Sequence, residues 1–200
     1  MTLVESFDKF NCDKGNNRHR YDRVYEPIFE PLRDKEFTVL EIGILGGASI
    51  EALLEYAPKA KIVGLDTFER INSNEISILE HPNVTGVKGD STKPSNDYFK
   101  HLHFDIIIDD GLHTHDAQRL TFQNYFPHLS STGVYFIEDV WPFDRMGWME
   151  KQHPWLKKHP TNWTDEKYQQ LLKTISPYTV AFHDIRDGYY PDTFIIEVRK

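Results

Sequence analysis

The sequence predicts an α/β fold with a mostly parallel sheet of seven strands and an antiparallel hairpin at its C-terminal end. Three observations support this class. Short apolar runs alternate with helix-like segments through most of the chain. Acidic residues gather where these runs end, and parallel sheets bind ligands at the carboxyl ends of their strands. Two β-rich runs close the chain, joined by a turn that contains Asp187 and Gly188.

The first third of the chain is expected to hold a helical cap, two strands and the helix between them. Residues 1–35 predict short helices, the clearest of them over 21–33. The runs 37–42 and 61–66 are short and apolar, as in buried parallel strands. A glycine turn follows the first run, and a helix is expected after it over 48–56.

The middle of the chain continues this alternation. A short helix is expected over 73–80, before a third strand at 84–88. The run 104–109 is almost wholly apolar and therefore suits a strand buried on both faces. A helix over 114–129 and a fifth strand at 133–137 complete the parallel part of the sheet.

The last third begins with an aromatic segment, 141–163, which has no clear hydrophobic period and holds all four tryptophans. We expect it to form a lid over a substrate. A helix over 165–175 then leads to the hairpin strands at 178–185 and 193–198. No repeat, low-complexity tract or linker divides the chain, which predicts a single domain over 1–200.

Composition and charge exclude several classes of protein. The chain is 39% hydrophobic and 14% aromatic, as in globular domains. A net charge of -8 argues against a nucleic-acid partner, because phosphate backbones bind clustered Lys and Arg. The single cysteine, Cys12, fits a reducing compartment, and no apolar stretch reaches the ~18 residues that span a bilayer. A cytoplasmic protein without a membrane partner is therefore expected.

The glycine turn after the first strand is the most informative motif. It runs Glu41-Ile-Gly43-Ile-Leu-Gly46-Gly47, and Asp66 ends the next strand nineteen residues later. Glycines let the backbone approach a ligand, and an acid at the second strand tip can bind a ribose diol. NAD would need G-x-G-x-x-G, and an acid at the first strand tip would repel its pyrophosphate. The motif favours S-adenosylmethionine (SAM), whose methionine part is cationic, over NAD or an unrelated glycine turn.

A second group of acids follows the fourth and fifth strands. Asp109 and Asp110 end one strand, and Glu138 and Asp139 follow the other. Neighbouring strand tips lie ~5 Å apart, so these carboxylates converge and call for a cation between them. Hard oxygen ligands favour Mg²⁺, with Asp110, Glu138 and Asp139 as the expected ligands. The alternative is that Asp109 or Asp110 caps the next helix while Glu138 and Asp139 are solvated.

His113 lies three residues past Asp110, on the loop that leaves the strand tip. A neutral imidazole there could take a proton from a hydroxyl that a metal has polarised, so we expect His113 to be the catalytic base. His115 and Asp116 also suggest a zinc site with His113. Zinc usually needs three or four nitrogen or sulfur ligands, and no second histidine cluster has matching spacing.

Together these motifs resemble the metal-dependent sugar O-methyltransferases of macrolide biosynthesis, the mycinamicin and demethylmacrocin type, over roughly residues 12–140. The motifs are, in order, Asp13-Lys14-Gly15 with His19 and Tyr21 downstream, Glu41 to Gly47, Ile108-Asp-Asp-Gly-Leu-His113 and Ile137-Glu-Asp139. The resemblance implies a Rossmann-like class I methyltransferase fold, Mg²⁺ held by the three acids and His113 as base. Leu112 departs from the serine common in the family, and an additional N-terminal region of the macrolide enzymes is not present.

This interpretation assigns the remaining site residues. The methionine and ribose side of SAM would be bound by Glu41, Gly43, Gly47 and Ser49, and its ribose hydroxyls by Asp66. The adenine would lie beside Asp90 and Ser91, and the methionine amine near Asp109. The acceptor would be a hydroxyl of a deoxysugar such as rhamnose, in a glycan or glycoside. Its apolar face would stack on aromatic residues of the lid, namely Trp141, Phe143, Trp148 and Trp155.

Several alternatives stay open at this point. A catechol-type phenol O-methyltransferase would share the metal and cofactor but prefer a flat aromatic slot. A hydroxylase of the related cephalosporin type would need a redox partner. A non-catalytic SAM-binding module would need neither His113 nor the metal acids. The lid aromatics could also serve only to pack against the core, and a homo-oligomer is compatible with each interpretation.

Overall fold

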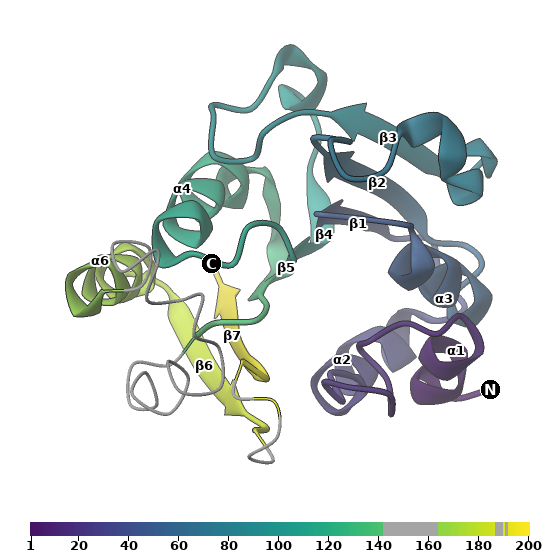
Figure 1. Cartoon of the computed structure of the whole chain (residues 1–200), viewed down its shortest axis with the longest axis horizontal. Helices are drawn as coiled ribbons and strands as arrows, with labels where there is room; N and C mark the ends of the chain where they lie inside the picture. The colour runs from purple at the N-terminus through teal and green to yellow at the C-terminus, as the bar shows by residue number, and fades with distance from the viewer. Residues whose placement is uncertain (142–163, 187–189, 191) are drawn as a thin grey trace.

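Seven strands form one curved sheet in the part of the chain that the structure describes (Figure 1). The structure is a computed structural model and describes residues 1–141, 164–186, 190 and 192–200. The strands are β1 (Thr38–Ile42), β2 (Lys61–Asp66), β3 (Val84–Lys88), β4 (Phe104–Asp109), β5 (Leu129–Ile137), β6 (Thr179–Asp184) and β7 (Phe194–Arg199). Their order across the sheet is β3-β2-β1-β4-β5-β7-β6.

Strands β1 to β5 are parallel, whereas β7 runs antiparallel to both of its neighbours, β5 and β6. The chain moves from β1 outward to β3 and then returns to place β4 on the other side of β1. The point at which the strand order reverses therefore lies between β1 and β4, where such sheets bind their ligands. The predicted mostly parallel sheet with a C-terminal antiparallel hairpin is confirmed.

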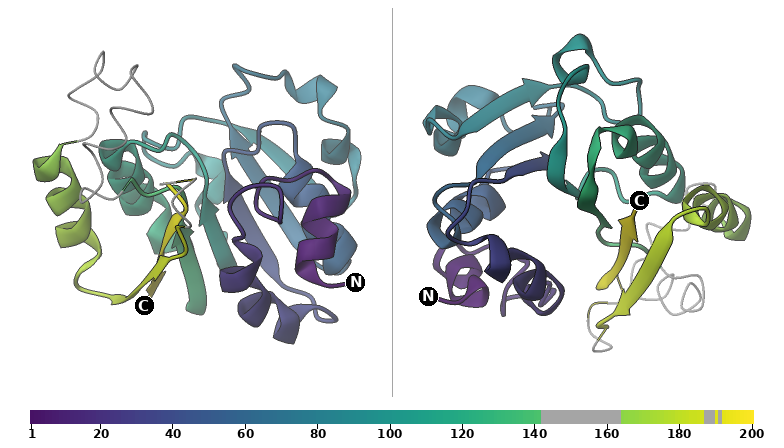
Figure 2. Two further views of the ribbon diagram at one scale, coloured as in Figure 1. Left: turned by 60° about the horizontal axis from the view of Figure 1, so that its bottom comes forward. Right: turned by 180° about the vertical axis from the view of Figure 1, so that it is seen from behind.

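Helices cover both faces of the sheet. On one face lie α1 (Leu3–Lys9), α2 (Asp22–Phe29) and α3 (Ala48–Tyr56), and on the other α4 (His115–Tyr125) and α6 (Asp165–Ile175) (Figure 1, Figure 2). Alternate residues of β1 point to the two faces, so that Val39 belongs to one buried apolar cluster and Leu40 to the other. Among the described residues, no helix has both the length and the apolar content that crossing a bilayer requires.

Two helices end earlier than predicted, each near a proline. The helix expected over 21–33 ends at Phe29 and is followed by a 3₁₀ turn that contains Pro31. The helix expected over 114–129 ends at Tyr125, before a 3₁₀ turn that contains Pro127. A proline has no N–H to donate to the carbonyl four residues earlier, which favours an end to the helical hydrogen bonding at Pro31 and Pro127, although α2 accommodates Pro27 in its interior.

Two further elements differ from expectation. The helix predicted over 73–80 is a pair of 3₁₀ turns, because Ile76 between them is extended and buried in the core. Strand β5 starts four residues earlier than predicted, at Leu129. Leu129 pairs with Phe104 and Val134 with Ile106, so the register shifts between these two pairs and the additional residues lie in β5.

Candidate active site

The pairing of β1, β4 and β5 brings the predicted acids to one edge of the sheet. Ile42 pairs with Asp109, and Asp109 pairs with Ile137. Asp110 and Glu138, the next residue on each strand, therefore emerge side by side. The convergence that the strand spacing predicted is present in the structure.

Asp66 holds the loop that follows β1. One oxygen of its carboxylate accepts hydrogen bonds from the backbone N–H of Ile44 at 2.9 Å and of Leu45 at 3.2 Å. The other accepts one from the N–H of Phe68 at 2.8 Å. A carboxylate has about four lone-pair sites, so acceptor capacity for ribose hydroxyls remains. Asp66 thus has a structural task in addition to its predicted one.

Gly43 and Gly47 are needed where they stand, because their φ angles are +84° and +83°. A Cβ atom on Gly43 would lie 2.1 Å from the backbone oxygen of Asp110, so the loop packs directly against the tip of β4. Glu41, at the end of β1, is buried and accepts a hydrogen bond from the hydroxyl of Ser49 on α3. Burial raises the pKa of Glu41 to about 7.

Replacing Gly43 with alanine is expected to lower the free energy of unfolding by about 2–4 kcal/mol. The added methyl group would collide with the backbone of Asp110, and alanine rarely adopts the positive φ of this position. Thermal or denaturant unfolding measures the loss. Gly46→Ala is the matched control in the same loop, since its Cβ would meet nothing closer than Ile71 at 3.8 Å. Equal stability of the two variants would contradict the close approach of loop and strand.

Asp110, His113 and Asp139 offer ligand atoms that all lie within 4.8 Å of one another. The Nε2 atom of His113 is 3.5 Å from Oδ1 of Asp110 and 3.7 Å from Oδ2 of Asp139. The His113 side chain is 32% exposed, which leaves it accessible to an acceptor. The structure therefore brings together the predicted base and two of the three predicted metal ligands.

Glu138, the third predicted ligand, faces the N-terminal segment. Its Oε2 atom lies 2.6 Å from Nζ of Lys14, and its Oε1 atom accepts a hydrogen bond from the hydroxyl of Tyr25. Nζ of Lys14 also lies 2.5 Å from Oδ2 of Asp110. Burial by itself would lower the pKa of Lys14, but Asp110 and Glu138 outweigh it and raise the pKa well above its ordinary value. The Lys14 ammonium is therefore charged and bridges two of the acids.

Asp139 is held by the same N-terminal segment. Its backbone is left-handed, with φ at +49°, a conformation that Asp adopts more readily than most residues. The hydroxyl of Tyr21 donates to Oδ1 of Asp139 and accepts from its backbone N–H at 3.3 Å. Nδ1 of His19 is 3.9 Å from the same carboxylate and 2.9 Å from Oγ1 of Thr193. Residues before α2 and at its start thus line the site.

The capping alternative for these acids is wrong. Thr114 is the N-cap of α4, and its hydroxyl accepts a hydrogen bond from the N–H of Ala117. Glu138 and Asp139 are 1% and 8% exposed, so neither is solvated at the surface. The acids are gathered inside the protein, where their charges must be compensated.

The zinc alternative also lacks support in the described residues. His115 is buried, and its Nε2 atom lies 2.9 Å from the backbone oxygen of Trp141. Asp116 forms an ion pair with Lys167 at 2.5 Å. Neither residue belongs to a group of converging ligand atoms in the part of the chain that the structure describes.

The other predicted cofactor residues lie at the same edge of the sheet. Asp109 is buried, which raises its pKa to about 7, and the hydroxyl of Tyr135 lies 3.3 Å from its Oδ2 atom. Asp90 and Ser91 follow β3. Asp90 is exposed and accepts hydrogen bonds from Thr92, whereas the Ser91 hydroxyl is 2.8 Å from that of Thr121. Their roles at the adenine stay predictions.

Most of the predicted aromatic lid lies outside the described residues, including Phe143, Trp148 and Trp155. Trp141 is described and only 6% exposed, which favours packing against the core at this position. Leu112, where the resemblance led us to expect serine, is 66% exposed on the loop before His113.

Three residues of the site, Lys14, Tyr21 and Tyr25, received no role from sequence reasoning. Lys14 belongs to the Asp13-Lys14-Gly15 motif, whose position in the N-terminal cap gave no hint of contact with β4 and β5. Tyr25 follows Tyr21 by four residues on α2, a spacing that places both side chains on one helix face. That spacing is the signal that could have identified the pair.

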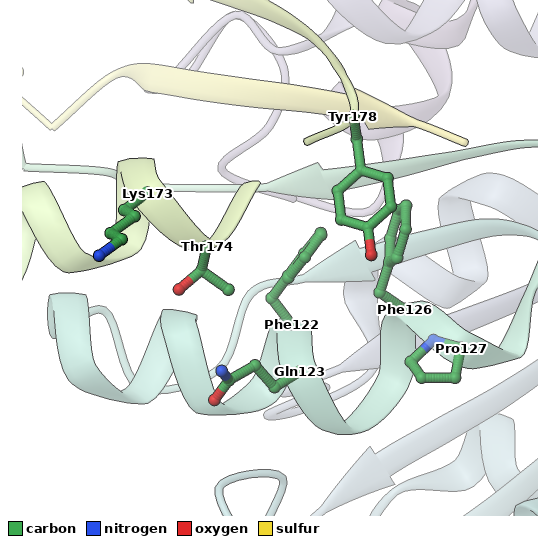
Figure 3. A pocket seen from close by; sticks show the side chains of 7 residues that line it. All are labelled: Phe122, Gln123, Phe126, Pro127, Lys173, Thr174 and Tyr178. Atoms are coloured by element: carbon green, nitrogen blue, oxygen red, sulfur yellow. The ribbon is translucent and has the colours of Figure 1, made fainter. Parts of the chain in front are cut away.

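A surface pocket of about 450 Å³ lies away from this site (Figure 3). Its lining comes from the last turns of α4 and α6, the 3₁₀ turn after α4 and the residue before β6: Phe122, Gln123, Phe126, Pro127, Lys173, Thr174 and Tyr178. Asp110 and Glu138, in contrast, directly follow the carboxyl ends of β4 and β5. The pocket is therefore separate from the chemistry at the strand tips.

Comparison with known families decides the class of this protein. Residues 40–140 match the model of a family described as a methyltransferase domain. The chain belongs to this methyltransferase family. The matched segment runs from β1 to the end of the Glu138-Asp139 pair and so contains both motifs described above.

The methyltransferase has curated relatives among enzymes named as O-methyltransferases. It is 32% identical over 149 residues to demethylmacrocin O-methyltransferase of Streptomyces fradiae, a match that covers 70% of this chain and 36% of that protein. It is 31% identical to mycinamicin VI 2''-O-methyltransferase of Micromonospora griseorubida, with the same two coverages. The match thus spans about a third of the length of these relatives, 36% in each case.

The methyltransferase also resembles the solved structure of MycE, a methyltransferase of the mycinamycin biosynthetic pathway in complex with Mg and SAH. The TM-score is 0.70 at 23% sequence identity, and the match covers 100% of this chain and 55% of MycE. At this identity the likeness concerns the fold. The predicted Rossmann-like class I methyltransferase fold is confirmed.

Proposed function

We propose that this methyltransferase is a SAM- and Mg²⁺-dependent O-methyltransferase that methylates a hydroxyl of a sugar in a glycoside. The observation that carries the proposal is the meeting of the β1 loop, the carboxylates of Asp110 and Asp139, and His113 at one edge of the sheet. A methyl donor, a cation and a base would then act within a few ångströms of one another.

The loop after β1 fits SAM. Its two glycines adopt positive φ and leave no room for side chains, so the backbone can approach a ligand closely. The N-terminus of α3 begins at Ala48, directly after the loop. Glu41 supplies an acid near the expected place of the cationic methionine part, and Asp66 retains acceptor capacity for ribose hydroxyls.

The acid group fits Mg²⁺. Its donors are carboxylate oxygens on rigid strand ends, with no cysteine among the converging ligand atoms of the described residues. Asp110, Glu138 and Asp139 would hold the ion. When bound, Mg²⁺ supplies a divalent charge that makes a nearby sugar hydroxyl easier to deprotonate.

His113 would take the proton from the acceptor hydroxyl. When bound, SAM would supply an activated methyl group to the acceptor oxygen, and the electron pair of the broken carbon–sulfur bond would stay on sulfur. Because the methyl donor is already activated, much of the rate gain would come from positioning donor and acceptor. In this proposal residues 1–35 form a cap that helps to position the acids.

The names of the curated relatives support a sugar as the acceptor, ahead of a catechol or a purely SAM-binding role. They include a 3'-O-methyltransferase that acts on a rhamnosyl tetracenomycin in Streptomyces olivaceus, 33% identical over 136 residues. A cytoplasmic site of action fits Cys12, which is a free thiol. Transfer of a labelled methyl group from SAM to a panel of glycosides and catechols, with and without EDTA, tests the proposal. Transfer to catechols alone would reject the sugar assignment.

Asp66→Ala is expected to weaken SAM binding by about 1–3 kcal/mol, since ribose hydroxyls and loop N–H groups would lose their acceptor. Calorimetric titration with SAM measures the change. Asp97→Ala, in the 3₁₀ turn before β4, is a control that should bind SAM normally. Unchanged affinity in Asp66→Ala would place the ribose elsewhere.

A further inference from the structure

Lys14 places a buried ammonium group between two acids that come from different strands. Its Nζ atom lies 2.5 Å from Oδ2 of Asp110, after β4, and 2.6 Å from Oε2 of Glu138, after β5. The Lys14 side chain is 3% exposed, and that of Glu138 is 1% exposed. Water therefore contributes little to screening this pair, and the contact is a strong one.

The two oxygens of Asp110 have different neighbours. Oδ2 contacts Lys14, whereas Oδ1 faces Nε2 of His113 at 3.5 Å. Asp110 thus stands between the ammonium and the group of converging ligand atoms that contains His113 and Asp139. Glu138 is not part of that group: one of its carboxylate oxygens contacts the Lys14 ammonium, and the other accepts a hydrogen bond from the Tyr25 hydroxyl.

The geometry points to Lys14 as an internal cation of the site, which compensates Asp110 and Glu138 when no metal is bound and competes with the divalent cation for them. The inference rests on the proposed function, because it concerns the same acids. A metal ion on Oε2 of Glu138 would either displace the Lys14 ammonium or share this oxygen with it. Where the ammonium stays in place, the two cations on one carboxylate repel each other.

The competition has a functional consequence. Uncompensated buried carboxylates repel and favour unfolding, so the site would be less stable without an internal cation when no metal is bound. Lys14 reduces this loss of stability, at the cost of weaker metal binding. Lys14 is accordingly a positioning residue that acts through Asp110 and Glu138.

The first test measures stability without metal. Lys14→Met keeps the apolar stem and removes the charge, and in EDTA its Tm should fall by about 10 °C, as expected when a buried ion pair loses one partner. Lys9→Met is the matched control, because Lys9 belongs to the same segment and pairs with Glu55 at 2.6 Å while 49% exposed. A Tm for Lys14→Met equal to that of the control would overturn the inference.

A second variant tests the same role in case Lys14→Met alone does not fold. Lys14→Met with Glu138→Gln removes both charges of the buried pair and should regain about half of the Tm lost in Lys14→Met alone. If the Lys14 side chain served only for packing, the additional Glu138→Gln change would not raise the Tm. Absence of rescue would therefore overturn the role of Lys14 as counter-charge.

The deciding test is calorimetric titration of the folded protein with Mg²⁺. Lys14→Met should bind Mg²⁺ about tenfold more tightly than the unmodified chain, because a competing charge has gone. Mg²⁺ should also raise the Tm of Lys14→Met by more than it raises that of Lys9→Met. Equal or weaker Mg²⁺ binding by Lys14→Met would overturn the competition.

Mg²⁺ binding by the unmodified chain separates failure of the proposed function from failure of the inference about Lys14. If the unmodified chain binds no Mg²⁺, metal dependence and the competition are both rejected. The stability measurements in EDTA then still decide whether Lys14 compensates the two acids.

Discussion

Asp110→Asn is expected to lower kcat by about 10²–10⁴-fold while SAM affinity stays close to that of the unmodified methyltransferase. The substitution keeps the shape of the side chain and removes the negative charge that faces both His113 and Lys14. A cation that helps to deprotonate the acceptor would lose one of its carboxylates. The donor loop after β1 would be left intact. Turnover with labelled SAM and calorimetry with SAH separate the two effects.

Asp116→Asn is the control for this prediction. Asp116 lies close by in sequence, but it pairs with Lys167 on α6 and takes no part in the acid group. Its turnover should change by less than about twofold, as is usual for a pair on the surface. EDTA should abolish turnover of the unmodified chain, and added Mg²⁺ should restore it. Full activity in EDTA would reject the metal, and with it the role given to Asp110.

The parallel part of the fold could be predicted because its strands are short apolar runs closed by acids. Strands β2, β3 and β4 lie at the predicted residues, 61–66, 84–88 and 104–109. Three predicted helices differed because local geometry had a larger effect than the hydrophobic pattern. Proline ended two of them, and the burial of Ile76 interrupted the third. Such effects depend on neighbours that a pattern of hydrophobicity does not contain.

The site could be predicted as far as strand topology determines it. Once β4 and β5 are neighbours in register, Asp110 and Glu138 must lie side by side. What surrounds them comes from a segment more than ninety residues away in sequence, since Lys14 is separated from Asp110 by 96 positions. No spacing rule connects such residues, because their contact depends on how the N-terminal cap packs against the sheet. The bridging role of Lys14 therefore had to come from the structure.

His113→Ala is expected to lower kcat by about 10²–10⁴-fold, the usual contribution of a positioned base. SAH affinity should change little, because the loop after β1 does not depend on this side chain. Added imidazole should restore part of the rate of His113→Ala, because it can take the proton in place of the missing side chain.

His101→Ala, at an exposed position before β4, is the matched control and should keep the rate. If His113→Ala retained the rate of this control on a competent sugar, the base would have to lie elsewhere. His19 is then the next candidate, because its Nδ1 atom is 3.9 Å from Asp139. His19 is only 2% exposed, however, whereas the His113 side chain is 32% exposed. An acceptor hydroxyl can therefore reach His113 without displacing the N-terminal segment, which is the physical reason for assigning the proton transfer to His113.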